Sequence, residues 1–137
     1  MALKRFSISL DNELLKRFDD IIKRKRYNNR SKVIADLIRN YLVEEEWKFE
    51  DRDSIGTINI VYDHHKRNLL NKLTEVQHKY HSQIVSDTHV HLDHNNCLEV
   101  IIVKGKTGII KKVAEDIIKI KGIKFGKLSI ATKGKEL

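Results

Sequence analysis

The tightest constraint on the fold is a short alternating segment, KRFSISLD, at residues 4–11. Its side chains alternate strictly in polarity: Phe6, Ile8 and Leu10 are apolar, whereas Arg5, Ser7 and Ser9 are polar. This alternation predicts a half-buried strand. No second strand pattern follows before residue 50, and about fifty residues cannot bury a stable core alone. We therefore expect two copies of the chain to pair these strands and intertwine as a dimer.

Two helices are expected after this strand. Asp11 can cap the first helix, whose apolar side chains recur at helical spacing. The stretch RKRYNNRS interrupts the pattern, and the second helix begins near Asn29 with its own apolar stripe. The apolar positions of the two helices are Leu14, Leu15, Phe18, Ile21 and Ile22, followed by Val33, Ile34, Leu37, Ile38, Tyr41 and Leu42. The N-terminal order is therefore strand, helix, helix.

The charge of the chain is unevenly distributed. The formal net charge is +8 and the pI is about 9.6, which suggests a polyanionic partner. Residues 1–42 carry eleven Lys and Arg against five Asp and Glu, residues 43–53 carry two against six, and residues 54–137 carry fourteen against eight. The acidic, poorly patterned segment predicts a boundary near residue 50, which gives domains 1–50 and 51–137.

The single cysteine excludes an intramolecular disulfide framework and fits a reducing compartment. No apolar run approaches the ~18 residues of a membrane span. The first residues lack the hydrophobic region of a signal peptide. We therefore expect a cytoplasmic protein with no membrane partner.

The second region reads as two repeats of strand, helix, strand. The expected strands are residues 55–63, 82–92, 97–105 and 123–133, and the expected helices are residues 64–80 and 107–120. The order βαββαβ predicts an α+β fold with a ferredoxin-like sheet that carries both helices on one face. The other face needs cover, and self-association through it predicts a homotetramer built from two intertwined dimers.

Potential metal ligands cluster within twenty consecutive positions. The chain has seven histidines and one cysteine, and this cluster contains His78, His81, His89, His91, His94 and Cys97. The HVH spacing places His89 and His91 on the same side of a strand, about 7 Å apart along the chain. Both imidazoles could then bind one ion.

The place of Cys97 depends on the register of the predicted hairpin. If His91 pairs with Cys97 and His89 with Glu99, the thiolate lies beside both imidazoles, and Glu99 can orient an imidazole N–H. A shift by one residue pairs Leu92 with Cys97 and turns the sulfur away. The apolar pattern fits both registers, whereas the ligand set favours the first.

Simpler explanations exist for each of these residues alone. A histidine on a strand is usually a surface residue, and a lone cysteine is usually a small buried hydrophobe. The spacing HxHx₅C across a hairpin favours a metal site instead. His81 and His94 are interpreted as solvated or neighbouring residues, and His64 and His65 as ordinary helix-start residues.

A metal site of this kind suits two functions that do not involve DNA regulation. One is that of a zinc-type hydrolase, and the other is that of a simple metal-binding protein. Three protein ligands with an open position would suit a catalytic zinc ion. No nucleophile–base pair or phosphate-binding loop accompanies the ligands in the sequence. The pattern therefore favours a role other than catalysis.

The N-terminal segment has the features of a DNA-binding module. Paired strands would present Arg5, Ser7 and Ser9 as a ribbon that fits the major groove, where Arg can bond guanine. The start of the second helix, with Asn29 and Arg30, would form a phosphate-binding site. The simpler alternative is a solvated edge strand on a dimerisation domain. The basic charge and the two amphipathic helices favour DNA binding.

Two stretches resemble a known family. Residues 1–43 resemble a ribbon-helix-helix DNA-binding domain, and YNNRS followed by VIADLIR is similar to the nickel-responsive transcriptional regulators of the NikR type. The stretch QHKYHSQIVSDTHVHLDHNNCLEV is similar to the metal-binding segment of that family. The resemblance implies an ACT-like second domain and no enzymatic activity. It also implies nickel-dependent binding to a palindromic operator in double-stranded DNA, with repression of nickel uptake genes.

The resemblance further implies a ligand set. One Ni²⁺ per subunit would be bound by His89, His91 and Cys97 of one subunit and by His78 of a neighbouring subunit. Gln77 and Glu99 would lie beside these ligands. A square-planar site of three imidazoles and one thiolate suits Ni²⁺, and Cu²⁺ would accept it too, whereas Zn²⁺ prefers a tetrahedron. Because one ligand comes from another subunit, metal occupancy would be coupled to DNA affinity through the quaternary arrangement.

Three lysine and arginine positions complete the comparison with the family. Lys66 and Arg67 match a basic pair that the family places near the DNA, although a solvated helix face is an equal alternative. Lys32 departs from the family pattern. Members can carry an acid there that, with the acid at the position of Asp36, holds a potassium ion between the two domains. We expect the ammonium group of Lys32 to supply this positive charge instead.

Overall fold

The chain divides into two compact units, residues 1–41 and residues 42–137. The structure is a computed structural model and describes residues 2–135 and residue 137. None of the helices in the described part of the chain is long and apolar enough to cross a membrane.

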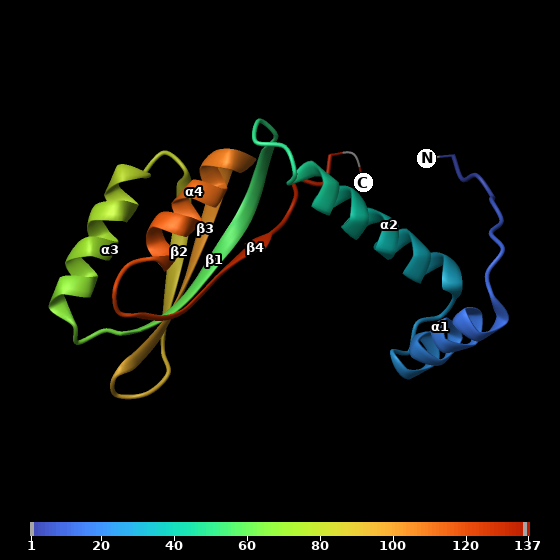
Figure 1. Cartoon of the computed structure of the whole chain (residues 1–137), viewed down its shortest axis with the longest axis horizontal. Coiled ribbons are helices and arrows are strands. Elements are labelled where there is room, and N and C mark those ends of the chain that lie inside the picture. The colour runs from blue at the N-terminus through green and yellow to red at the C-terminus, as the bar shows by residue number, and fades with distance from the viewer. Residues whose placement is uncertain (1, 136) are drawn as a thin grey trace. The chain divides into compact units, whose positions relative to one another are not determined.

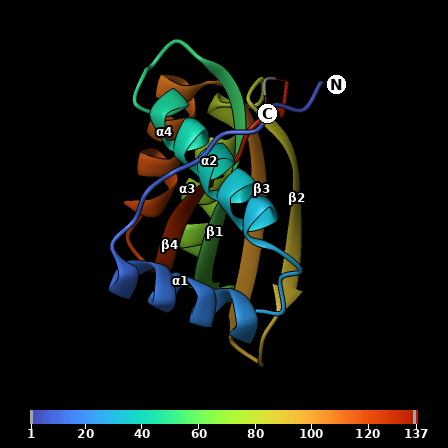
Figure 2. The ribbon, with the colours of Figure 1, turned by 90° about the vertical axis from the view of Figure 1, so that its right-hand side faces the viewer.

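The first unit contains two capped helices. Helix α1 (Asn12–Arg24) follows Asp11, whose Oδ2 accepts hydrogen bonds from the backbone N–H groups of Glu13 and Leu14 at 3.0 and 3.2 Å. Helix α2 (Arg30–Glu46) follows Asn29, whose Oδ1 accepts from the backbone N–H of Lys32 at 2.9 Å. A short turn joins the two helices (Figure 2). The expected helix starts are confirmed, because each cap satisfies backbone donors that the first turn leaves unpaired.

Residues 2–10 form no strand in this single chain, although the alternating pattern predicts one at residues 4–11. The apolar side chains of that pattern are exposed, at 68% for Phe6 and 55% for Ile8. Leu37 and Tyr41 on α2 are also exposed. A strand needs hydrogen bonds from a neighbouring strand, and one copy of the segment provides none. The exposed apolar side chains therefore suit burial against a second copy.

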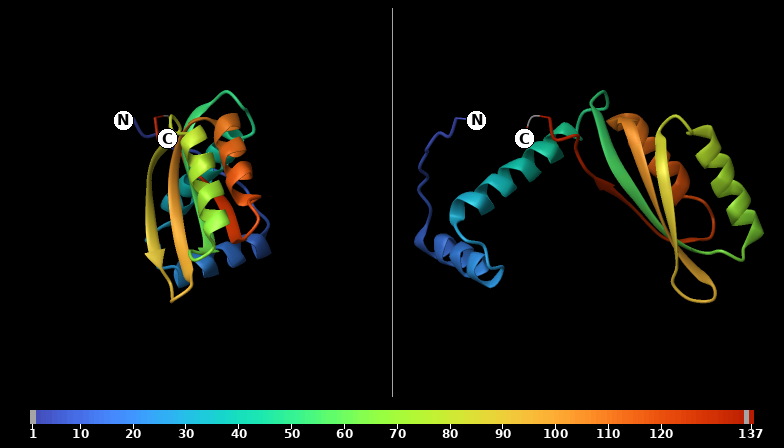
Figure 3. Two further views of the ribbon diagram at one scale, coloured as in Figure 1. Left: turned by 90° about the vertical axis from the view of Figure 1, so that its left-hand side faces the viewer. Right: turned by 180° about the vertical axis from the view of Figure 1, so that it is seen from behind.

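The second unit has the expected order βαββαβ (Figure 1). Its elements are β1 (Asp53–Asp63), α3 (Arg67–Lys79), β2 (Ile84–His91), β3 (Asn96–Lys106), α4 (Thr107–Ile118) and β4 (Ile123–Ile130). The strand order is β2-β3-β1-β4, and each neighbouring pair is antiparallel. Helices α3 and α4 lie side by side over one face of the sheet (Figure 3). The ferredoxin-like α+β fold is confirmed.

The core lies between the sheet and these two helices. Its fully buried side chains include Ile58, Ile60, Ile101 and Val103 from the strands and Ile110, Val113 and Ile117 from α4. The two central strands, β1 and β3, alternate between buried and half-buried positions, as strands of a sheet covered on one face should. The opposite face of the sheet keeps half-buried Leu98, Val100 and Ile102, with Val90 and Phe125 45% and 54% exposed.

The acidic segment at residues 43–53 contributes to the core of the second unit. Trp47 is only 3% exposed, and its indole N–H donates to the carbonyl oxygen of Ala131 at 2.8 Å. Gly56 leaves room for this ring, since a Cβ there would lie 3.4 Å from it and 3.0 Å from the carbonyl oxygen of Ser129. The division between the units therefore falls within α2, and the composition boundary near residue 50 lies inside the second unit.

Candidate metal centre and DNA interface

The β2–β3 hairpin has the register that the ligand set favours. His91 lies opposite Cys97, and His89 lies opposite Glu99. Directly opposed residues of an antiparallel pair project to the same face. The four side chains therefore share the face of the sheet that the helices cover, and the one-residue shift is excluded.

The loop between these strands is held by Asp93. Its Oδ1 accepts from the backbone N–H groups of Asn95 and Asn96 at 2.9 and 2.7 Å. The side-chain amide of Asn96 also donates to both oxygens of Asp93. These hydrogen bonds, led by that of the Asn96 side chain, lower the pKa of Asp93 to about 2. A turn that is hydrogen-bonded in this way fixes the register on which the candidate site depends.

His89 and Cys97 are in contact. Nδ1 of His89 lies 3.9 Å from Sγ of Cys97, and the sulfur is buried at 2% exposure. Metal bonds of about 2.0–2.3 Å to nitrogen and sulfur would allow two ligands of one ion to lie up to about 4.3 Å apart. The observed separation is within that limit, so these two donors fit one late first-row transition metal ion.

A buried carboxyl group lies beneath His89. Glu99 is 1% exposed; Tyr62 Oη donates to its Oε1 at 2.8 Å and Gln77 Nε2 donates to its Oε2 at 2.9 Å. Oε2 also lies 3.6 Å from Nε2 of His89. Burial raises the pKa of Glu99, and burial together with the Glu99 hydrogen bond raises the pKa of Tyr62. Glu99 therefore lies next to His89, and Gln77 is hydrogen-bonded to Glu99.

The ring of His91 is placed differently from that of His89. It packs edge-on against the His64 ring, with centroids 4.9 Å apart. His64 and His65 also direct their Nε2 atoms to the carbonyl oxygen of His94, at 2.9 and 3.0 Å. Both residues lie directly before the N-cap Lys66 of α3, so they flank the helix start and are not part of the helix. The backbone N–H of His64 donates to the carbonyl oxygen of Asn95 at 3.0 Å, which joins this loop to the hairpin.

His78 lies on α3, one residue after Gln77, and is exposed. Its ring faces that of His81, with centroids 6.1 Å apart. Gln77 points to Glu99, so the next residue on the helix is rotated away from the sheet. This orientation leaves the His78 side chain exposed on α3.

Two residues near the candidate site were not recognised from the sequence. Tyr62 reaches Glu99 from β1, and Asp87 Oδ2 lies 3.1 Å from Nε2 of His89. Asp87 could have been found, because it continues the alternation of His89 and His91 by one step along β2. Tyr62 gave no comparable signal, since a tyrosine at the end of an apolar strand is ordinary core material.

The candidate DNA-contacting residues differ in their surroundings. Arg30 forms a two-bond ion pair with Asp19, at 2.9 Å from Nε and 2.7 Å from Nη2. Asn29 caps α2, so its side-chain oxygen is already engaged. Arg5, Ser7 and Ser9 lie in the exposed segment before α1, and Lys66 and Arg67 lie exposed at the start of α3. Asp19 thus neutralises part of the charge that the sequence suggested for phosphate binding.

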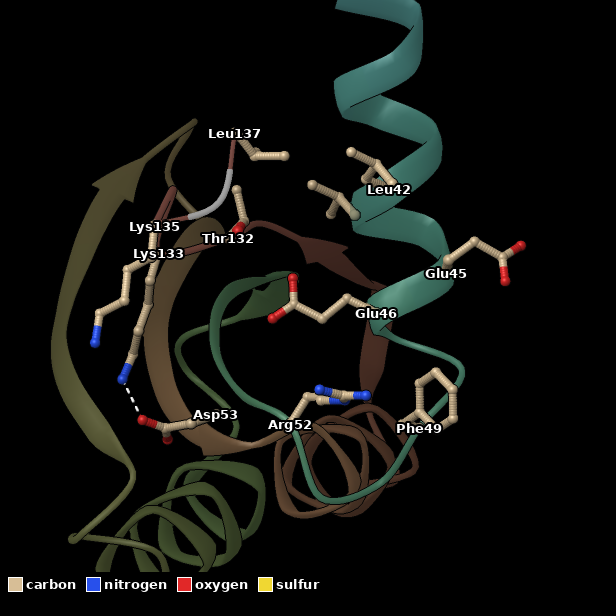
Figure 4. A pocket seen from close by; sticks show the side chains of 11 residues that line it. Leu42, Glu45, Glu46, Phe49, Arg52, Asp53, Thr132, Lys133, Lys135 and Leu137 are labelled. Carbon is tan, nitrogen blue, oxygen red and sulfur yellow. Dashed lines mark hydrogen bonds and ion pairs between the residues drawn. The ribbon is translucent and has the colours of Figure 1, made fainter. Parts of the chain in front are cut away.

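A pocket of about 460 Å³ lies at the opposite end of the sheet domain. Its lining includes Glu46, Arg52, Asp53 and Lys133 (Figure 4). Asp53 begins β1, and Tyr62 is nine residues further along the same strand, so the pocket and the candidate metal centre are about 30 Å apart. Lys133 forms an ion pair with Asp53, and Arg52 lies over the ring of Phe49 at 4.9 Å. Lys133 and Asp53 are thus paired within the pocket, and histidine is not among its described lining residues.

Both parts of the chain match known protein families. Residues 55–131 match the family described as the NikR C-terminal nickel-binding domain, and residues 4–45 match ribbon-helix-helix proteins of the copG family. A protein of Geobacter sulfurreducens that carries the provisional name nickel-responsive regulator is 51% identical over 133 residues, which are 97% of this chain and 96% of that protein. One from Thermococcus onnurineus with the same name is 50% identical over 137 residues, which are 100% of this chain and 99% of that protein.

A solved structure of an uncharacterized Thermotoga maritima protein shares the fold of the sheet domain. Its TM-score is 0.53 at 13% identity, and the match covers 59% of this chain and all of that one. The family matches are of transcriptional regulators and not of enzymes, so the hydrolase alternative is not favoured. With a ribbon-helix-helix segment, a nickel-binding domain and relatives at about 50% identity over nearly the whole chain, this protein belongs to the family of nickel-responsive regulators.

Proposed function

We propose that this protein is a nickel-dependent repressor of nickel uptake genes that binds a palindromic operator as a homotetramer. The observation that carries the proposal is the hairpin register, which places His91 opposite Cys97 and His89 in contact with it. Such a regulator acts on the chromosome, so we place it in the cytoplasm.

The metal would be held by His89, His91 and Cys97 of one subunit and His78 of a neighbouring subunit, with one Ni²⁺ per subunit. Thiolate and imidazole donors together suit late first-row divalent ions. When bound, Ni²⁺ would link side chains of two subunits. The Glu99 carboxyl group accepts hydrogen bonds from Tyr62 and Gln77 and lies 3.6 Å from Nε2 of His89. In this position it would help to orient the imidazole ring.

Two surfaces support the proposed assembly. The first unit exposes the apolar side chains of residues 2–10, which a second copy would bury as a paired ribbon. The sheet domain has an open face with Val90 and Phe125 half exposed above half-buried Leu98 and Ile102. Association through this face would join two intertwined dimers into a tetramer.

DNA contacts would come from both units. Arg5, Ser7 and Ser9 of each copy would read base edges from the ribbon, with Arg as the donor to guanine. The capped start of α2 at Asn29 and Arg30 would bind phosphate through backbone N–H groups, and the Arg30 side chain contributes less charge because Asp19 pairs with it. Lys66 and Arg67 would add contacts to the phosphate backbone.

Coupling between the sites follows from the proposed position of His78. A ligand given by a neighbouring subunit favours one arrangement of the sheet domains when the metal is bound. That arrangement sets the spacing of the two ribbons and so favours an operator with two half-sites one or more helical turns apart.

The test is a titration of the purified protein with nickel, copper and zinc, followed by visible absorption and by binding to candidate operator DNA at a stated salt concentration. We expect a thiolate-to-nickel absorption band and a rise in operator affinity at the same nickel equivalents. Metal binding without any change in DNA affinity would contradict regulation, and DNA binding that is independent of metal would leave a simple repressor.

A further inference from the structure

Asp87 lies beside the proposed nickel ligands and has no role in the function described above. It precedes His89 by two residues on β2, so its side chain projects to the same face of the sheet. Its partner in the register is Ile101, which places it diagonally across from Glu99 on β3. Its Oδ2 lies 3.1 Å from Nε2 of His89, which is hydrogen-bond distance.

The two ring nitrogens of His89 have different surroundings. Nε2 faces two carboxyl groups, Asp87 Oδ2 at 3.1 Å and Glu99 Oε2 at 3.6 Å. Nδ1 faces Sγ of Cys97 at 3.9 Å and Oη of Tyr62 at 3.4 Å. A neutral imidazole carries one proton, and an ionised carboxylate can only accept it. The proton therefore belongs on Nε2, and the lone pair of Nδ1 points toward the sulfur.

Of the two carboxyl groups, Asp87 is the one that can decide the position of the proton. It is closer to Nε2, and Glu99 already accepts hydrogen bonds from Tyr62 and Gln77. Asp87 also lies on the same edge strand as His89, two residues away, so the two side chains are neighbours on one face of β2.

We propose that Asp87 is a positioning residue that holds His89 as the Nε2–H tautomer and so leaves Nδ1 free to bind metal beside Cys97. The identity of the metal rests on the proposed function, whereas the tautomer is a property of the metal-free chain. A hydrogen bond to the remote nitrogen of a ligand histidine orients the ring and strengthens the donor nitrogen. Loss of such a partner typically weakens metal affinity by about 10–100-fold.

The experiment uses the full-length protein labelled with ¹⁵N, with Asp87→Asn, Asp87→Glu and Glu115→Gln as variants. Glu115 is an exposed carboxylate on α4 of the same domain, so its variant controls for the loss of one negative charge. Long-range ¹H–¹⁵N correlation spectra of the metal-free proteins at about pH 8, where a free imidazole is neutral, give the tautomer of His89. Nickel affinity is then measured by competition with a chelator of known affinity.

We expect wild-type His89 to be the Nε2–H tautomer. In Asp87→Asn the amide can donate to Nε2, so the tautomer should move toward Nδ1–H and nickel affinity should fall at least about tenfold. Asp87→Glu should restore both readouts in part, because the longer side chain keeps the carboxylate. Glu115→Gln should match the wild type in both.

An unchanged tautomer in Asp87→Asn would overturn the proposal, even if nickel affinity fell, because the loss would then be a general charge effect. A shifted tautomer with unchanged nickel affinity would overturn it as well. A wild-type protein that binds no nickel would refute the proposed function, and the tautomer would still report on the hydrogen bond between Asp87 and His89.

Discussion

Tyr62→Phe should lower the free energy of unfolding by about 2–3 kcal/mol. Tyr62 is 1% exposed and donates to Oε1 of Glu99 at 2.8 Å, and Glu99 is also 1% exposed. The variant leaves this carboxyl oxygen buried without its donor, while Gln77 still donates to the other oxygen. An unsatisfied buried polar group costs about 1–3 kcal/mol, with larger values for charged groups.

The assay is urea unfolding of the metal-free protein at one fixed protein concentration, because association contributes to the apparent stability. Tyr80→Phe is the matched control. It removes a phenol hydroxyl that donates to Oδ2 of Asp116 at 2.6 Å, but the Asp116 side chain is 17% exposed and can bond water instead. We expect this control to cost less than about 1 kcal/mol, with an unchanged dependence on urea in both variants.

The control also has a pH signature. The hydrogen bond from Tyr80 lowers the pKa of Asp116, so its stabilisation is present above the unfolded pKa and is lost as pH falls toward the folded pKa. Tyr80→Phe should therefore make stability less sensitive to acid below about pH 4. If Tyr62→Phe cost no more than Tyr80→Phe, burial of the Glu99 network would not be what makes Tyr62 important, and the reasoning would be refuted.

Four further outcomes are expected. Cys97→Ser should abolish the thiolate-to-nickel absorption and the nickel-dependent gain in operator affinity, because a hydroxyl is a poor anionic ligand near pH 7; unchanged spectra would exclude the thiolate as a ligand. His78→Ala should still bind nickel through three residues of one subunit, with weaker affinity and an altered visible spectrum, and a wild-type spectrum would leave His78 as a helix-end residue. Arg5→Ala should weaken the free energy of operator binding by about 1–3 kcal/mol and relax the preference at one base position. Arg30→Ala should lower the affinity for all DNA sequences alike and by less, because the Arg30 charge is already paired with Asp19. Binding to matched and mismatched sites separates the two variants. Lys32→Glu should acquire a specific potassium requirement for operator binding that the wild type lacks. Operator affinity is measured at constant ionic strength in potassium, sodium and organic-cation salts. A strong potassium requirement in the wild type would contradict the proposal that Lys32 replaces the ion.

The structure supports the local part of that last idea. Nζ of Lys32 lies 2.6 Å from Oδ1 of Asp36, and Arg39 contacts the same oxygen at 3.2 Å. The first contact was expected from the spacing of four residues, since i and i+4 share one helix face. An exposed pair of this kind contributes only about 0.3–0.5 kcal/mol, so its proposed value is in placing a charge and not in stabilising the helix.

Local periodicity was enough to derive most of the fold and part of the candidate site. The alternation of His89 and His91 follows from strand geometry alone, and the order βαββαβ follows from hydrophobic periods of two and 3.6. The sequence allowed two registers of the β2–β3 hairpin, and the one that places His91 opposite Cys97 could be chosen because it brought the proposed ligands together. These features depend on neighbours close in sequence, and the chemistry of those neighbours is visible in the residue types.

Contacts between distant segments were decided only by tertiary packing. Tyr62 and Glu99 are 37 residues apart, and Trp47 reaches Ala131 across 84 residues. The ion pair of Arg30 with Asp19 changes what Arg30 can offer to DNA, and the pattern that suggested Arg30 for phosphate binding did not indicate this partner. The N-terminal segment shows the same limit: its alternating pattern is local, but residues 2–10 form no strand in the single chain, because a strand needs hydrogen bonds from a neighbouring strand. A periodic pattern specifies which face of an element is buried, whereas the partner that buries it depends on how the whole chain, or two chains, pack together.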